Sequence, residues 1–389
     1  MMNYKKYFIF LLAISVIFFS CKTEKQTLNV INLKKAQGVR NYSNIYALPK
    51  TVVRVNVHFT QTISKVGPFS KYAESLLGIK SVISRDQVDW SINKLDFTSY
   101  PVPDTNHLYI IEQESDFNNI GISLTACGLI NSVNTNKIND KYFYEIEKKQ
   151  FAGTMNYNPE EEELNNTNIL DFNDVPVLKD IQQKKTVYEK AKAMAEKIYT
   201  LREDRAAIVV GDGYTETMPD GLALKEIVSS LNRLEQKYLS MFVGKKMQRE
   251  FNYSFDFVPD SPKKITQAIL FRFSTSKGIV SFNDVSGSPV IIEINSFQNI
   301  NQIAKFNKKQ DHLKRVAKID AKVHGLYYRI PEMGSVKLLI DEKVIAEKKV
   351  MIAQFGEVHP LNPEYLNGSY HIEFYPELGS IKQISKIMK

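Results

Sequence analysis

Hydrophobic residues recur at spacings of three and four between residues 182 and 245, which is the repeat of amphipathic helices. The pattern is clearest after Asp220, a residue that can cap the first turn of a helix, and it stops at Gly244. We expect one face of this helix to be apolar, with Leu224, Ile227, Val228, Leu231, Leu234, Tyr238, Met241 and Phe242. The charged residues fall elsewhere, namely Lys225, Glu226, Arg233, Glu235 and Lys237.

A second helical pattern precedes it, from about residue 184 to residue 208. Its apolar stripe is narrower and includes small residues: Val187, Ala191, Met194, Ile198 and Leu201. A narrow stripe of this kind suits a close helical partner. We therefore predict an antiparallel helical hairpin that turns between Gly211 and Pro219, with outer flanks covered by neighbouring strands.

On both sides of the hairpin the pattern changes to strict alternation, which is typical of half-buried strands. Val53, Val55, Val57 and Phe59 alternate with polar residues, and Phe251, Tyr253, Phe255 and Phe257 do the same. A one-residue shift in the alternation predicts a β-bulge near Lys94. A short helix from Pro68 to Leu77, stopped by Gly78, and a turn at Cys127-Gly128 complete the local predictions.

These patterns predict an α+β fold in which β-rich N-terminal and C-terminal domains flank a central antiparallel α-helical hairpin. The N-terminal β-rich domain covers residues 45–152, and the hairpin covers residues 182–245. The C-terminal β domain has a first part at 250–296 and its last strands at 325–376. Between them lie an acidic, Asn-rich loop or linker at 153–181 and a basic linker at 297–324, with a tail at 377–389.

The first residues resemble an export signal. Lys5 and Lys6 precede an apolar run that is too short to span a bilayer and that ends at Ser20-Cys21. The junction is similar to a bacterial lipobox, in which the cysteine becomes the lipidated first residue. We predict a lipoprotein signal peptide at 1–20, a lipid on Cys21 and a flexible tether at 21–44; ordinary secretion is the alternative. Because Lys22 is not aspartate, the predicted location is the cell envelope, at the outer membrane.

Composition narrows the choice of partners. The 389-residue chain has a formal net charge of +8, which suits anionic lipid, whereas nucleic acid is a poor partner for an exported protein. Its other cysteine is Cys127, so lipidation of Cys21 leaves no pair for an intramolecular disulfide. We expect the membrane, reached through the lipid on Cys21, and an envelope protein or a glycan as partners.

Motifs for chemistry are weak. Gly211-Asp212-Gly213 lacks the third glycine of a dinucleotide fingerprint, and Asp212, Glu216 and Asp220 are either capping residues or oxygen ligands for calcium. Ser274 and Lys277 fit the S-x-x-K spacing but lie between strand patterns without the accompanying motifs. The histidines are scattered, and Cys127 has no recognisable catalytic partner. We predict no catalytic, cofactor-binding or metal-binding residue and no cofactor.

Several phrases resemble a family of uncharacterised lipoproteins from Bacteroides-type bacteria, a domain of unknown function. They include Tyr46-Ala47-Leu48-Pro49, Gly67-Pro68-Phe69, the run at 201–205, Leu231-Asn232-Arg233-Leu234-Glu235, Phe271-Arg272-Phe273-Ser274 and the run at 325–331. The resemblance spans roughly residues 45–376. It implies an envelope location and supplies no activity or site residue.

Three functional hypotheses follow. The first is a non-enzymatic cell-envelope lipoprotein with a binding or scaffolding role. The second is a glycan-binding adhesin, because aromatic rings on sheet faces can stack on sugars. The third is a polysaccharide or peptidoglycan hydrolase, whose paired carboxylates would come from distant strands and leave no local motif.

Overall fold

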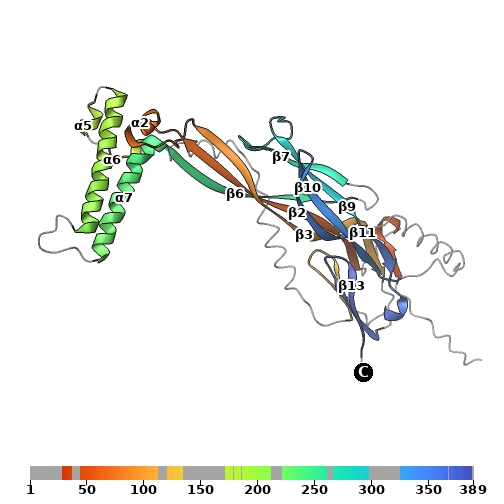
Figure 1. The fold of residues 1–389 in the computed structure, drawn as a ribbon. Helices are drawn as coiled ribbons and strands as arrows, with labels where there is room; N and C mark the ends of the chain where they lie inside the picture. Colours follow the sequence, from red (N-terminus) through yellow and green to blue (C-terminus); the bar gives the residue numbers. More distant parts are fainter. Residues whose placement is uncertain are drawn as a thin grey trace, which may run out of the picture.

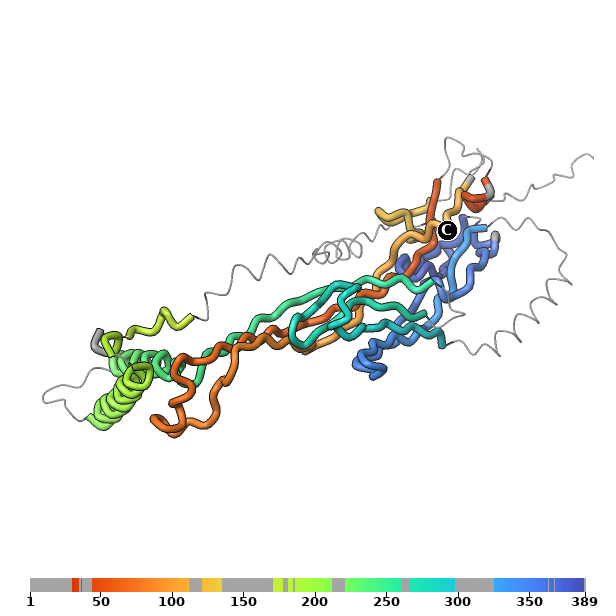
Figure 2. Tube along the Cα trace, turned by 90° about the horizontal axis from the view of Figure 1, so that it is seen from above, coloured from red at the N-terminus to blue at the C-terminus, as the bar shows by residue number. Residues whose placement is uncertain are grey.

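The computed structural model describes residues 29–36, 44–112, 121–134, 171–177, 179–184, 186–211, 221–260, 266–297, 325–366 and 368–387. This part of the chain is elongated and mostly β (Figure 1). Its strands form three antiparallel sheets, which we call the long sheet, the five-stranded sheet and the terminal sheet. A pair of helices lies at one end, and the terminal sheet lies at the other (Figures 1 and 2).

The strand β2 (Asn44–Lys65) connects these parts. Its 22 residues span about 70 Å at the usual rise of a strand. Tyr46 and Leu48 near its start are buried in the core beside the terminal sheet, and Val53, Val55, Val57 and Phe59 are buried in the middle of the molecule. Its end reaches the helices. The alternation predicted for residues 53–59 is confirmed, with Val53, Val55, Val57 and Phe59 all buried.

The long sheet has the strand order β1-β3-β2-β6. It contains β1 (Asn29–Asn32), β3 (Gln87–Glu112) and β6 (Lys245–Phe257) besides β2. Where β2 meets β3, His58 pairs with Lys94 but Phe59 pairs with Ile92, so that Asn93 is an extra residue. This is the bulge predicted near Lys94. By contrast, β2 pairs with β6 without a register shift.

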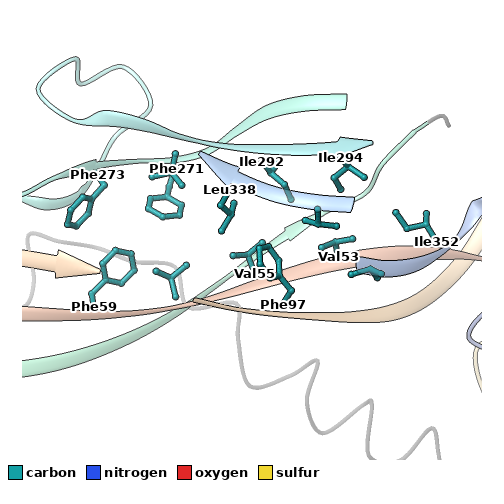
Figure 3. Close-up of a cluster of buried hydrophobic side chains, with 14 of the residues drawn as sticks. Val53, Val55, Phe59, Phe97, Phe271, Phe273, Ile292, Ile294, Leu338 and Ile352 are labelled. Atoms are coloured by element: carbon teal, nitrogen blue, oxygen red, sulfur yellow. The ribbon is translucent and has the colours of Figure 1, made fainter. Parts of the chain in front are cut away.

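The five-stranded sheet covers one face of the long sheet. Its order is β11 (Lys343–Pro360), β10 (Tyr327–Ile340), β9 (Ser288–Ser296), β7 (Thr266–Ser274) and β8 (Gly278–Val280). Apolar side chains from both sheets interdigitate between them (Figure 3). Phe59 of β2 contacts the rings of Phe271 and Phe273 of β7, with ring centroids 5.8 and 5.6 Å away.

The terminal sheet joins distant segments of the chain. Its order is β13 (Ser380–Lys386), β12 (Tyr370–Tyr375), β5 (Ile130–Val133) and β4 (Ile122–Leu124), and a 3-10 helix, η5 (Pro363–Leu366), precedes β12. Ile372 pairs with Val133 across β12 and β5. Cys127 and Gly128 lie in the turn between β4 and β5, as predicted, and Gly128 has a φ of 77°.

Buried hydrogen bonds fix β11 to β2. The backbone N–H of Thr51 donates to Gln354 Oε1 at 2.8 Å, and Gln354 Nε2 donates to the carbonyl oxygens of Thr51 and Pro259. The Thr51 hydroxyl accepts from the Ala353 N–H at 2.9 Å. These bonds satisfy polar groups inside the interface between the sheets, and they hold the two sheets in one register.

The α-helical segments lie between β2 and β3 or between β5 and β6 in sequence, but together at one end of the molecule in space (Figure 1). They include α5 (Lys179–Gln182), α6 (Val187–Val210), α7 (Gly221–Val243) and a short segment of η2 (Ser70–Tyr72) and α2 (Ala73–Leu77). The short helix expected at 68–77 is confirmed in part, and Gly78 caps it at a φ of 69°. Gly244 ends α7 at a φ of 90°, as predicted.

The predicted fold class is wrong. The described part of the chain is mostly β and its strands form three sheets, and the helical hairpin is not a central element between two β domains. The reason is that β6, which follows the hairpin, pairs with β2, which precedes it, over residues 53–65 and 245–257. Strands before and after the hairpin therefore share a sheet and a core, and the hairpin projects from the end of that sheet.

Two strands were not predicted from the alternation. β1 lies within the segment interpreted as a tether, and β13 lies within the segment interpreted as a tail. Other predictions concern residues outside the described ranges. These are the signal peptide at 1–20 with Cys21, most of the acidic loop at 153–181 and nearly all of the basic linker at 297–324.

Candidate interaction surface on the helical hairpin

The hairpin is well defined at its start. Thr186 caps α6: its hydroxyl accepts from the Glu189 N–H at 3.1 Å, and the Glu189 carboxylate accepts from the Thr186 N–H at 3.0 Å. This reciprocal pair satisfies two amides that have no partner within the helix. At the other end of α6, Gly211 caps the last turn at a φ of 78°. The predicted cap of α7, Asp220, lies outside the described residues.

The half of the hairpin next to the sheets has a core of its own. The narrow stripe predicted for the first helix is confirmed at Ala191, Met194, Ile198 and Leu201, which are buried. The fifth predicted residue, Val187, is exposed. These side chains pack with Tyr238, Met241 and Phe242 of α7, and with Phe69 from the η2–α2 segment. The Phe69 N–H also donates to the carbonyl oxygen of Met241 at 2.9 Å. This core packs the helices against the η2–α2 segment, which follows the end of β2.

A buried carboxylate closes that core. Glu235 of α7 is only 5% exposed and binds two guanidinium groups of α6. Arg202 Nε donates to Glu235 Oε1 at 2.7 Å, and Arg205 Nη1 donates to Glu235 Oε2 and to Asn232 Oδ1. Burial opposes ionisation of Glu235, but the hydrogen bonds from Arg202 and Arg205 outweigh it and hold its pKa below the usual value.

The prediction for Glu235 was wrong, because the sequence pattern placed it with the solvated charges. The spacing could have located it, since Glu235 lies four residues after Leu231 and three before Tyr238, on the apolar stripe. The signal for its partners is a pair of arginines three residues apart on the facing helix, Arg202 and Arg205.

Beyond this clamp the hairpin has no buried core. Among its described residues, none after Leu201 in α6 and none before Glu235 in α7 is buried. Large apolar side chains are exposed instead, including Val210 at 77% and Leu222 at 79%, with Val209 and Ile227. We call residues 202–210 of α6 and 221–234 of α7 the distal half of the hairpin; it exposes apolar side chains and has no buried residue.

One flank of α7 is basic and carries a shallow, open depression, which we call the hollow and whose described lining comes from α7 alone. The hollow has a volume of about 540 Å³, and its described lining includes the cations Lys225, Arg233 and Lys237 and the polar residues Ser229, Asn232 and Gln236. Arg233 binds Glu226 at 2.7 Å, and Lys237 lies 3.9 Å from Asp174. Lys225 forms no ion pair with any residue in the described ranges. The flank thus suits an acidic surface.

A second polar cluster joins all three sheets. Asp104 Oδ2 accepts from Arg329 Nη2 and lies 2.7 Å from His107 Nδ1. The Arg329 N–H donates to the carbonyl oxygen of Gly379, next to β13. Burial would raise the pKa of Asp104, but hydrogen bonds from His107 and the Asn106 N–H, together with the charge of Arg329, lower it to about 2.

This cluster contains two parts of a nucleophile-activating triad, a carboxylate and an imidazole, but its contacts are structural. In the described ranges the hydrogen bonds of His107 go to Asp104 and Arg329 and not to a serine or cysteine. Arg329 is 2% exposed. The cluster therefore neutralises a buried arginine where the three sheets meet.

The structure separates the residues of the S-x-x-K spacing. Ser274 ends β7 and lies 3.1 Å from the Ser276 hydroxyl. Lys277 lies in the turn before β8, where its ammonium group donates to Asp284 Oδ2 and Ser286 Oγ. The lysine is thus held by the β8–β9 loop, and this geometry gives Ser274 no base.

The remaining candidate residues do not converge. His359 contacts Glu357, and His371 contacts Glu373 and the Asn134 carbonyl oxygen. Within the described ranges no three His, Cys, Asp or Glu side chains form a group that could hold a metal ion. Cys127 is exposed. Asp212, Glu216 and Asp220, the alternative calcium ligands, lie outside the described residues, as does Cys21.

Comparisons with known proteins supply a family and no activity. No curated protein matches the chain, and no solved structure matches it. A family model described as a domain of unknown function, DUF4831, matches residues 42–382. That range begins before β2 and ends within β13, so it includes the hairpin and the five-stranded sheet, the long sheet without β1, and the terminal sheet up to the start of β13. The chain therefore belongs to the DUF4831 family of domains of unknown function.

Proposed function

We propose that this protein is a non-enzymatic lipoprotein of the cell envelope that binds a protein partner through the distal half of its helical hairpin. The observation that carries the proposal is the absence of buried residues, among those described, beyond Leu201 in α6 and before Glu235 in α7. Two helices without a core are marginally stable in water, because helices in proteins gain most of their stability from packing. A partner that covers this half would supply that packing.

The chemistry of the surface favours an acidic partner. Lys225, Arg233 and Lys237 line the hollow on α7, and the exposed apolar residues Leu222 and Ile227 belong to the same helix. Apolar contact at the centre with complementary charge at the rim is the usual composition of a protein interface. Exposed aromatic side chains that could stack on a glycan, such as Phe282 and Tyr375, lie outside the distal half of the hairpin. A protein with an acidic, partly apolar surface therefore fits this half better than a glycan.

The position of the hairpin suits an anchored protein. Cys21 is eight residues before Asn29, the first residue of β1, and β1 lies at the end of the molecule opposite the helices (Figure 2). A lipid on Cys21 would place that end at the membrane and hold the hairpin away from it by about the length of β2, roughly 70 Å. The resemblance to lipoproteins of Bacteroides-type bacteria and the Ser20-Cys21 junction support the anchor and the outer membrane. Among the described residues, no helix is long and apolar enough to cross a membrane.

The binding proposal is tested by site-specific photocrosslinking in intact cells. A photoreactive amino acid replaces Ile227 in the hairpin or, as the control, Gln248, which is exposed on β6 of the long sheet. We expect the hairpin position to yield a reproducible protein adduct that the control position does not yield. Reversing Lys225 and Arg233 to Glu should reduce the yield of that adduct.

Three outcomes would contradict the proposal. They are equal crosslinking from both positions, crosslinks only to carbohydrate, and an adduct whose yield is unchanged by the two charge reversals. The first indicates nonspecific contact, the second indicates an adhesin, and the third removes the assigned role of the basic hollow.

The anchor is tested separately. We expect the Cys21→Ser chain to leave the membrane fraction and to lose incorporation of a clickable fatty acid. If that variant stays in the membrane with unchanged electrophoretic mobility, the protein is not a lipoprotein.

A further inference from the structure

The outer face of the five-stranded sheet, which is turned away from the core in Figure 3, carries a continuous row of apolar side chains. Leu339 of β10 is in register with Val344 of β11 and Ile291 of β9, and Ile291 is in register with Ile269 of β7. The neighbours Leu338 and Ile292 are fully buried, so alternation directs this row outward. Val344 is 51% exposed and Ile269 is 40% exposed.

Two residues further along the strands, the same face carries a row of charges. Glu347, Lys337 and Glu293 are in register on β11, β10 and β9, and Gln267 of β7 follows. Glu293 accepts hydrogen bonds from the amides of Gln267 and Asn295, and Glu347 accepts one from the Ser335 hydroxyl. Lys337 forms no ion pair within 4 Å with any residue of the described ranges.

We propose that this face binds the same face of a second copy of the chain, about a two-fold axis that runs along the strands between β9 and β10. That operation places β10 of one copy on β9 of the other. Leu339 then contacts Ile291 of the second copy, and Lys337 meets Glu293 of the second copy. Because the axis is two-fold, both contacts occur twice. The row of charges is thus complementary to itself in this arrangement.

The size of the face suits a reversible dimer. In this arrangement β11 lies on β7 and β10 lies on β9, so four strands of each copy overlap. Four strands about 4.8 Å apart and the nine residues of β9 give a footprint of about 600 Å² on each copy, compared with about 800 Å² per partner in a standard interface. The strands of this sheet run along the length of the molecule (Figure 2), so the two copies lie parallel with both hairpins at the same end. The inference goes beyond the proposed function and does not depend on the lipid or on the hairpin partner.

Charge reversal at the two contacting positions tests it. We expect sedimentation velocity of the full chain in detergent to show a concentration-dependent dimer. Lys337→Glu places two carboxylates opposite each other at both contacts, and Glu293→Lys places two ammonium groups there. Each variant alone should associate at least about tenfold more weakly than the unsubstituted chain. Mixed together, they should restore the dimer. One contact then pairs the introduced carboxylate with the introduced ammonium group, and the other pairs the unchanged Lys337 with the unchanged Glu293.

The controls are Lys246→Glu and Glu250→Lys, which reverse exposed charges on β6 of the long sheet and should leave association unchanged. Circular dichroism of each variant checks that it is folded, and recovery in the mixture cannot come from misfolded chains. The proposal is overturned if the unsubstituted chain stays monomeric at the highest soluble concentration. It is also overturned if the single variants associate normally, or if the mixture does not recover.

Discussion

Replacing Glu235 with Gln should loosen the helical hairpin and leave the sheets unchanged. The substitution keeps the shape of the side chain but leaves Arg202 and Arg205 without their shared anion. Removing one member of a buried ion pair typically costs 3–5 kcal/mol. Both arginines are about one-third exposed and can turn toward water, so we expect a smaller loss, about 2 kcal/mol.

Hydrogen exchange read by mass spectrometry measures this effect locally. A loss of about 2 kcal/mol corresponds to roughly 30-fold faster exchange of amides that open with the hairpin. Peptides from α6 and α7 should show this change, and peptides from β2 and β9 should not. The matched control is Glu226→Gln, on the same helix and also paired with an arginine, but exposed. It should change exchange little, because exposed ion pairs contribute little to stability.

The reasoning is refuted if Glu235→Gln and Glu226→Gln behave alike, since burial would then not determine the strength of the pair. It is also refuted if exchange in the sheets rises as much as in the helices. That result would mean that the hairpin and the sheets unfold as one cooperative unit.

Three further predictions concern the sheets. Asp104, with a pKa of about 2 in the folded chain against an ordinary value of 3.8, should contribute stability that is fully present above pH 3.8 and is lost as the pH falls toward 2. The loss is at most about 2.4 kcal/mol. Urea unfolding of the unsubstituted chain and of Asp104→Asn should give a difference in unfolding free energy that shrinks below pH 4, and a constant difference would contradict this prediction. Gly356→Ala should prevent normal folding, because an added Cβ would lie 1.6 Å from the carbonyl oxygen of Ile330, whereas Gly121→Ala should be neutral because that site is open. Soluble yield and melting temperature compare the two variants, and equal melting temperatures would refute the assigned contact. Phe271→Ala should lower the free energy of unfolding, measured in urea, by about 3–5 kcal/mol. A decrease below about 1 kcal/mol would show that the core of Figure 3 is loosely packed.

Local patterns predicted the elements of this protein better than their arrangement. The alternation at residues 53–59 and 251–257 locates two strands because the apolar face of 53–59 is buried and that of 251–257 packs, partly buried, against the same core. Alternation identifies a face, however, and contains no information about which strand lies alongside. The pairing of β2 with β6 across an intervening hairpin was therefore not predictable, and the hairpin was wrongly placed at the centre.

The candidate surface was predicted only in part for a related reason. Helical spacing identified the stripes of α6 and α7, but it could not show that the η2–α2 segment, residues 172–177 and α5 cover the half nearest Phe242 and Met194. The neighbouring strands that we expected to cover the flanks contribute no residue to this core. Glu235 was assigned to solvent because a carboxylate is usually exposed, and its burial depends on two arginines from another helix. The cluster of Asp104 and Arg329 likewise joins positions more than 200 residues apart.

The central claim is that β2 is one unbroken strand that holds the hairpin far from the N-terminal end of the molecule. Pulsed electron paramagnetic resonance between spin labels at Ile45→Cys and Lys65→Cys, with Cys21 and Cys127 replaced by Ser, measures this directly. Twenty residues of strand predict a separation of about 60–65 Å. A distance below about 40 Å would mean that the strand is folded back, and it would contradict the account.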